Sequence, residues 1–467
     1  MVHHQKYRCA RGKLLILAMA VGQCLRLFGQ STAPREFISF QTAQPALKAM
    51  SEALPPGLKA ASPLDADRWS KWVQAEDRAI RERLDRGTED TLTNLLRFGV
   101  TFTKEYRIND EYLVRYGQSS LVNAFADNRA NDLIAALAAP NAPEGIADMR
   151  RFVENKGFSL KTRAERARLK KYLLENLARL RDEFLKYRAQ AKDERRFQLF
   201  QDRGISLDTN LWPDYALDRQ FREMVERRLL KTGNVRRIAI VGPGLDFANK
   251  EAGNDFYPPQ TIQPFAVLDS LFRLGVADPA TVELYTLDIS HEVNSHLERV
   301  KKKALQGRSY TVQLPWNTER PMSDEYRASF IAYWQALGEK IGEPVPPIPV
   351  PSAAAATKTR ALKIRPEIVR KVTALDMNVV YQRLPLSSEQ AFDLVIGTNI
   401  FVYYGEFEQM LARANMAAML KPGGYLLSND KLADKVSFGL DGVLETPITS
   451  SVQPLVRDTM FCYQRGR

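Results

Sequence analysis

The chain has 467 residues, of which 45% are hydrophobic, 26% charged and 9% aromatic, and its formal net charge is +12. This length usually corresponds to more than one domain, and the composition is that of a globular protein. These values exclude wholesale disorder, a disulfide-rich miniprotein and a protein with many membrane spans. Three cysteines and four histidines disfavour a Cys/His metal cluster. The positive charge suggests an anionic partner without establishing one.

Residues 1–29 have the pattern of a secretory signal peptide. Four Lys and Arg residues precede an apolar run at 14–21, which is too short to span a bilayer because a spanning helix needs roughly 20 apolar residues. We expect cleavage near Gly29 and export to the periplasm or the medium, which leaves Cys462 as the single cysteine. The alternatives are lipidation at Cys24, an amphipathic N-terminal helix or a wrongly assigned start codon. Without a signal peptide the protein would be cytoplasmic.

Residues 30–234 are predicted to form a mainly α-helical N-terminal domain. The clearest helix covers about 160–196, where apolar residues recur at steps of three and four and form one stripe. The stripe consists of Leu169, Leu173, Leu177, Leu180 and Phe184.

The segment 150–196 carries 16 Lys and Arg against 7 Asp and Glu, an excess of +9. This pattern is typical of a solvated helix face with ion pairs at i,i+4 spacing. The alternative is a docking surface for an anionic partner. Nucleic acid is disfavoured as that partner because aromatic residues are not interleaved with the charge.

Residues 235–467 show a different pattern, in which strands alternate with helices. The expected strands are 236–241, 282–287, 392–396 and one beginning at 423, with helices at 260–274, 290–305 and 405–420. This alternation predicts an α/β domain, doubly wound around a mostly parallel sheet. An insertion at about 317–360 interrupts it, with a helix at 324–341 and a Pro/Ala-rich linker at 343–356 that we expect to be stiff and extended.

Small and polar residues follow three of the predicted strands. In a doubly wound sheet, ligands bind beyond the carboxyl ends of the strands, so these residues are expected to converge on one site. Each residue also has a structural explanation: a glycine pair can form a turn, a strand-end aspartate can begin one, and tyrosines can be core packing. The candidates are Gly242 and Gly244 after the first strand, Asp288 after the second, and Asn399, Tyr403 and Tyr404 after the third.

Together these motifs resemble the class I S-adenosylmethionine-dependent methyltransferases. The strand–Gly-x-Gly–helix unit, the acid-ended second strand, the Phe-Asp-Leu-Val strand at 392–395 and the Leu-Lys-Pro-Gly-Gly turn at 420–424 occur in that family's order. The stretch 364–430 is similar to the chemotaxis-receptor methyltransferase branch, through Ile-Arg-Pro-Glu at 364–367 and the residues 398–404. The resemblance covers residues 235–467 and implies a Rossmann-like methyltransferase sheet.

The resemblance implies S-adenosylmethionine as cofactor and a role for each matching residue. Gly242 and Gly244 would let the methionine part lie on the backbone, Asp288 would hold the ribose hydroxyls, Asn378 and Val379 would contact the adenine edge, and Asn399 and Tyr403 would face the methyl group and its acceptor. The acceptor would present an oxygen or nitrogen on a small molecule or a protein.

Two departures from the family's pattern concern the first glycine motif. Ile240 stands where the family usually has an acid, and Asp246 stands where it usually has a third glycine. The amino group of the methionine moiety therefore loses a usual partner, for which Asp246 or Asp255 is the candidate substitute.

Three other interpretations compete with this one. A dinucleotide-binding site fits less well, because Phe247 stands at its third glycine and Asp288 lies too far along the chain. His291 is a candidate base, although its place beside Ser290 is typical of an exposed first-turn residue. The remaining alternative is an exported, non-catalytic scaffold or interaction protein that retains the fold, since S-adenosylmethionine is made in the cytoplasm.

Overall fold

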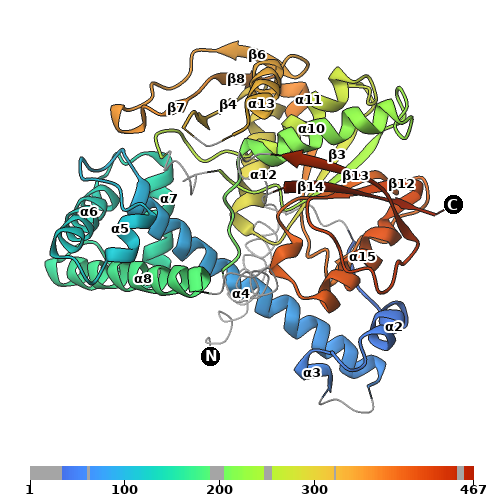
Figure 1. Ribbon diagram of the computed structural model, residues 1–467, viewed down its shortest axis with the longest axis horizontal. Coiled ribbons are helices and arrows are strands. Elements are labelled where there is room, and N and C mark those ends of the chain that lie inside the picture. Colours follow the sequence, from blue (N-terminus) through green and yellow to red (C-terminus); the bar gives the residue numbers. More distant parts are fainter. Residues whose placement is uncertain are drawn as a thin grey trace, which may run out of the picture. The chain divides into compact units, whose positions relative to one another are not determined.

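The computed structural model describes residues 34–59, 64–189, 204–246, 255–319, 322–449 and 457–466 (Figure 1). Residues 35–467 form one compact unit. The expected signal peptide, its cleavage near Gly29 and the lipidation of Cys24 lie outside the described residues. Within the described ranges, no helix is long and apolar enough to cross a membrane.

A seven-stranded sheet with the order β13-β14-β12-β11-β2-β3-β9 forms the centre of this unit. Five adjacent strands pair with one another in parallel: β2 (Arg237–Val241), β3 (Glu283–Asp288), β9 (Val372–Asp376), β11 (Phe392–Gly397) and β12 (Leu420–Ser428). β14 (Arg457–Arg465) is antiparallel to β12, and β13 (Leu440–Thr449) is antiparallel to β14. The predicted α/β class with a doubly wound, mostly parallel sheet is confirmed.

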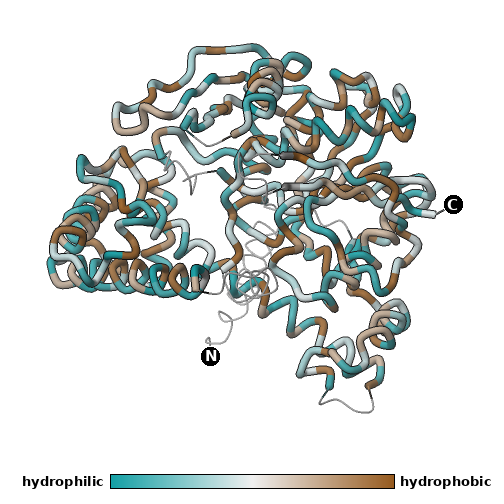
Figure 2. Tube along the Cα trace, in the orientation of Figure 1, coloured by the Kyte–Doolittle hydropathy of each residue, from teal (hydrophilic) through white to brown (hydrophobic). Residues whose placement is uncertain are grey.

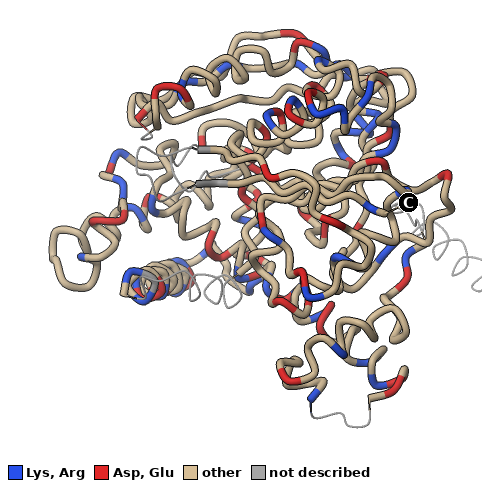
Figure 3. The backbone as a smooth tube through the Cα atoms, turned by 45° about the vertical axis from the view of Figure 1, so that its right-hand side comes forward, with Lys and Arg blue, Asp and Glu red and all other residues tan. Residues whose placement is uncertain are grey.

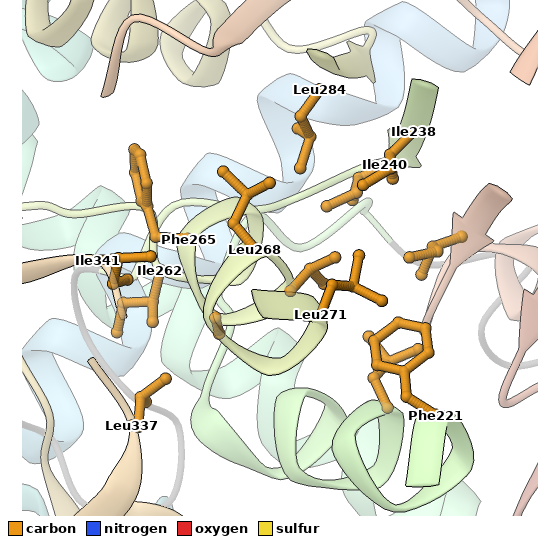
Figure 4. Close-up of a cluster of buried hydrophobic side chains, with 14 of the residues drawn as sticks. Phe221, Ile238, Ile240, Ile262, Phe265, Leu268, Leu271, Leu284, Leu337 and Ile341 are labelled. Carbon is orange, nitrogen blue, oxygen red and sulfur yellow. The ribbon is translucent and has the colours of Figure 1, made fainter. Parts of the chain in front are cut away.

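Helices cover the sheet and explain why its strands are apolar on both faces. α10 (Leu211–Glu226), α11 (Gln263–Arg273) and α12 (His291–Leu305) share one hydrophobic cluster with β2, β3 and β11. Figure 4 shows part of this cluster, in which Leu268 and Leu271 of α11 lie near Ile240 of β2. α15 (Glu406–Met419) joins β11 to β12 (Figure 1). Hydrophobic residues recur along the central strands and along one side of several helices (Figure 2).

The N-terminal region is helical, as predicted. Its elements are β1 (Glu36–Phe37), α2 (Phe40–Ala49), α3 (Pro56–Lys59), α4 (Ala66–Phe98), α5 (Asp110–Arg115), α6 (Ser120–Ala138), α7 (Glu144–Asn155) and α8 (Arg163–Ala189). The leucine stripe predicted on α8 is confirmed, because Leu169, Leu173 and Leu177 are fully buried in a cluster with α4, α6 and α7.

The first half of α4 is joined to the sheet region. Trp72 packs edge-on against Tyr381 and Phe407, with ring centroids 5.9 and 5.8 Å apart. β1 pairs with the short strand β10 (Gln382–Arg383). The N-terminal end of the helical region therefore contacts the second half of the sheet region, although the two are far apart in the sequence. The domain boundary expected between residues 234 and 235 stays a prediction.

Acids on neighbouring helices and on α8 itself pair with part of the basic segment 150–196. Basic and acidic residues are interspersed along the chain (Figure 3). The pairs are Lys156 with Asp85 and Glu89, Lys170 with Asp127, and Arg179 with Asp90 and Glu183. These internal partners favour the structural interpretation of the charge, and the anionic docking partner stays a prediction.

The insertion between α12 and β9 folds as a small antiparallel layer. Its elements are β4 (Tyr310–Gln313), β5 (Trp316–Asn317), α13 (Asp324–Ala336), β6 (Gly342–Val345), η1 (Ser352–Ala354), β7 (Thr357–Lys358), β8 (Ala361–Ile364) and α14 (Pro366–Val369). β6 pairs with β8. The start of the Pro/Ala-rich segment is extended, because Glu343, Pro344 and Val345 belong to β6, and η1 forms one short helical turn farther along. Its role as a stiff linker stays a prediction.

Candidate functional site

The order of the strands places a ligand crevice at the carboxyl ends of β2 and β11. From β2 the chain passes outward to β3 and β9, whereas β11 and β12 lie on the other side of β2. Such a reversal opens a crevice between the helices that leave these strands. A cavity of about 50 Å³ lies there. Six of the eight residues assigned from the sequence line it: Gly242, Gly244, Asp288, Asn378, Val379 and Tyr403.

Gly242 forms the turn that follows β2, and its backbone requires a glycine. Its φ angle is +60°, in the left-handed region that side chains disfavour. A Cβ atom there would lie 2.2 Å from Cδ1 of Ile400. The Gly242 N–H donates to the carbonyl of Leu287 at 2.9 Å, which fixes the turn against β3.

Asp288 ends β3 and lines the cavity. The side chain is buried, and Oδ1 accepts the Ser290 N–H at 2.7 Å. Ser290 also caps α12, as predicted. Burial raises the pKa of Asp288 to about 7, and the charges of Asp376 and Glu292 add to the increase. The group can therefore change its protonation near neutral pH.

Asn378 and Val379 line the cavity after β9, but the amide of Asn378 has partners within the chain. Its Nδ2 donates to Oδ1 of Asp77 on α4 at 2.9 Å, and its Oδ1 accepts the Val380 N–H at 3.1 Å. The neighbouring Asp376 accepts from Arg81, also on α4, at 2.7 Å. α4 therefore supplies polar groups to the edge of the crevice assigned to adenine.

Tyr403 and Tyr404 both line the cavity from the segment after β11. The Tyr403 hydroxyl accepts the Ser206 N–H at 3.3 Å, and the Tyr403 carbonyl accepts from Arg83 at 3.2 Å. Burial raises the pKa of Tyr404 above its ordinary value, so that this hydroxyl stays protonated.

Asn399 does not line the cavity, although it lies directly before Ile400, which does. Its backbone has a φ angle of +59°. Its backbone N–H donates to Oδ1 of Asn429 after β12, and its Oδ1 accepts from Nδ2 of the same residue. The carboxylate of Asp430 accepts the Phe401 N–H at 3.2 Å. Residues at the end of β12 thus hold this segment, and Asn399 faces Asn429 instead of the crevice.

Neither candidate substitute for the missing acid lines the cavity. Asp246 is buried and accepts from the Tyr257 hydroxyl and from Gln260. Asp255 accepts the N–H groups of Val100 and Thr101. Both carboxylates already receive internal donors, which disfavours their expected role, and that role stays a prediction. Ile240 is fully buried in the core cluster, so the position of the usual acid is apolar.

The N-terminal half supplies four lining residues that the sequence did not indicate: Leu84, Ile205, Ser206 and Leu207. No motif marks them, since they come from a helix and a loop far away in the chain. Asp376 does not line the cavity, but it is a second aspartate at a strand end, paired with Asp288 across β3 and β9. The position of an acid directly after an apolar strand is the signal that could have indicated it.

The few other reactive residues lie outside the crevice. Burial raises the pKa of the Cys462 thiol on β14 to about 12. His296 is buried and bonded to the Tyr310 hydroxyl at 2.9 Å. His291 is exposed and lines a second cavity of about 380 Å³ between α4, α7 and α12. Across the described ranges, no group of three or more His, Cys, Asp or Glu could hold a metal ion.

The residue types around the crevice suit a nucleoside, but the space does not. Asp288 offers a carboxylate for hydroxyls, and Val379 offers an apolar edge for a base. Pockets for ligands of drug size measure about 300–1,000 Å³, whereas this cavity measures about 50 Å³. Leu84, Ile205 and Leu207 contribute apolar side chains to its lining.

No family model matches the chain, and no curated protein matches it. Solved structures with similar substructures include the N-methyltransferase NodS from Bradyrhizobium japonicum WM9, at 11% identity, covering 54% of this chain and 98% of that one with a TM-score of 0.27. Magnesium protoporphyrin IX methyltransferase from Synechocystis PCC 6803, solved with bound SAM, matches at 9% identity over 54% of this chain and 80% of that one, with a TM-score of 0.26. The glycopeptide N-methyltransferase MtfA, complexed with SAM, matches at 10% identity, covering 54% of this chain and 94% of that one, with a TM-score of 0.26. The fold class rests on the strand order of this chain itself.

Proposed function

We propose that the chain is an S-adenosylmethionine-dependent methyltransferase acting on an oxygen or nitrogen acceptor. One observation carries the proposal. Residues that the sequence resemblance assigned to the cofactor lie after three different strands, and they come together around one cavity at the switch point. The five parallel strands followed by an antiparallel pair agree with the methyltransferase sheet that the resemblance implied. The chemotaxis-receptor branch stays part of the proposal.

The residues of the crevice would bind and orient the cofactor. The turn at Gly242 and Gly244 would carry the methionine part, Asp288 would accept the ribose hydroxyls, and Asn378 and Val379 would contact the base. Bound S-adenosylmethionine supplies a methyl group on a sulfonium, and its transfer to an acceptor needs positioning and electrostatics instead of a protein nucleophile. The ring of Tyr403 or Tyr404, both of which line the cavity, would stabilise the cation through its face.

Calorimetry with S-adenosylmethionine and the full chain tests this proposal. Asp288→Ala should weaken binding about tenfold or more, because hydrogen bonds to charged groups contribute roughly 1.5–3 kcal/mol. Asp278→Ala is the matched control, since this exposed aspartate precedes β3 at the opposite end of the strand. Absence of binding at millimolar cofactor, both in this chain and in the Gly87→Ala variant described below, would refute the enzyme function. Equal weakening by both variants would refute the ribose assignment.

A non-catalytic scaffold is the second candidate. It is favoured by the apolar core position of Ile240 and by the small volume of the crevice.

We also propose export, on the basis of the pattern in residues 1–29. Fractionation of cells that express the native N-terminus tests it, and an unprocessed chain in the cytosol would contradict export.

A further inference from the structure

A short segment of the chain lies directly on the glycine turn of the crevice. We call residues 204–210 the strap. The carbonyl of Leu207 in the strap accepts the Leu245 N–H at 2.7 Å. Gly244 has a φ angle of +74°, and a Cβ atom there would lie 2.9 Å from both the Leu207 carbonyl oxygen and Cβ of Thr209. The strap therefore covers the backbone surface that the methionine part of the cofactor would need.

The strap is closely packed against α4. A Cβ atom on Gly87 would lie 1.7 Å from the carbonyl oxygen of Ile205, and a Cβ atom on Gly204 would lie 2.3 Å from the Gly87 nitrogen. The Ile205 N–H also donates to the carbonyl of Arg83 at 3.2 Å. Such backbone contact requires glycine on both sides, so the strap and the middle of α4 form one cover.

Polar side chains of α4 attach this cover to the crevice. Asp77 and Arg81 bind Asn378 and Asp376, which follow or end β9. Arg83 donates to the carbonyl of Tyr403, and the Tyr403 hydroxyl receives the N–H of Ser206 in the strap. The cover thus uses the same edge groups that a nucleoside would use, and its apolar residues Leu84, Ile205 and Leu207 line the cavity beside them.

We propose that the strap and the middle of α4 are an autoinhibitory cover that must move away before the cofactor enters. This inference rests on the proposed methyltransferase function. The cover and the cofactor compete for Asn378, for the surface of Gly244 and for the volume of the crevice. The apparent affinity of the cofactor is then reduced by the fraction of molecules in which the cover is open.

Gly87→Ala tests the competition because the added Cβ atom overlaps Ile205 and disfavours the covered state. Gly87 lies outside the crevice, and alanine favours the helix itself. Calorimetry with S-adenosylhomocysteine should show binding tightened about tenfold relative to the wild-type chain, since the open fraction rises. The matched control is Gly442→Ala on β13, where a Cβ atom meets nothing within 4 Å and should leave the affinity unchanged.

Hydrogen exchange on the wild-type chain gives a second measurement that needs no variant. Saturating S-adenosylhomocysteine should accelerate exchange of the amides in residues 204–210 and leave α6 unchanged. If S-adenosylhomocysteine binds but exchange in the strap is unchanged or slower, the proposed autoinhibitory cover is wrong while the proposed function stands. Equal affinities of Gly87→Ala and the wild type would lead to the same conclusion. Absence of binding in every variant would overturn the proposed function together with this inference.

Discussion

At the scale of single residues, Asp288 combines burial, a strand-end position and a pKa near neutrality. Burial raises its pKa to about 7, so the carboxyl is mostly protonated at pH 6 and mostly ionised at pH 8. An ionised carboxylate accepts hydrogen bonds from hydroxyls more strongly than a protonated one does. The ligand proposed for this site would therefore favour the ionised form.

The affinity for S-adenosylhomocysteine is expected to rise about tenfold between pH 6 and pH 8, because the ionised fraction of Asp288 rises by about that factor. Calorimetry across this range measures it. Asp288→Asn should bind weakly and without this pH dependence. A wild-type affinity that is constant over the range, or a slope retained in Asp288→Asn, would show that another group controls binding.

At the scale of elements, α4 is important because one helix reaches both the helical core and the crevice. Arg81 joins Asp376, Asp77 and the carbonyl of Ile289. The Arg81 and Asp376 side chains are only 27% and 24% exposed, so their pairing is partly shielded from water. On the same helix, the pair Lys71–Asp67 is 75% and 72% exposed.

Arg81→Ala should lower the free energy of unfolding by about 1.5–3 kcal/mol, because it removes the guanidinium that pairs with two partly buried carboxylates. Lys71→Ala is the control and should cost about 0.5 kcal/mol or less, as exposed pairs contribute little. Denaturant titration of the full chain measures both. Equal losses of unfolding free energy in the two variants would mean that the contacts of Arg81 with Asp376 and Ile289 do not stabilise the fold.

The sequence predicted those elements whose pattern is local. Apolar strands such as 392–396, the Ser290 cap and the leucine stripe of α8 each follow from a few neighbouring residues, and all are present in the structure. The cover could not be predicted in this way. The sequence around its glycines and leucines carries no motif. Their role depends on contacts between residues that are distant in the chain, such as Gly87 and Ile205.

At the scale of the whole molecule, several buried groups couple folding to pH. Burial raises the pKa of Asp214, Asp246 and Asp288 to about 7. A native pKa above the unfolded value means that the folded chain holds more protons, so this contribution to stability is present below about pH 4 and is lost as the pH rises through 7. His296 acts in the opposite direction, because burial lowers its pKa to about 4. Its neutral form favours the folded state increasingly until about pH 6.5.

The three aspartates outnumber the histidine, so the free energy of unfolding should fall between pH 5 and pH 8, most steeply near pH 6 and less above pH 7, where the aspartates are ionised in the folded chain as well. Asp246→Asn should reduce the steepness of this fall by at most roughly 1.4 kcal/mol per pH unit, which is the contribution of one proton, because the amide does not ionise. Denaturant titrations at pH 5, 6.5 and 8 measure the slope, and Asp278→Asn, on an exposed turn, should leave it unchanged. A free energy that rises toward pH 8 would mean that these buried carboxyls ionise without cost, and the same result would remove the physical basis for the pH-dependent binding expected at Asp288.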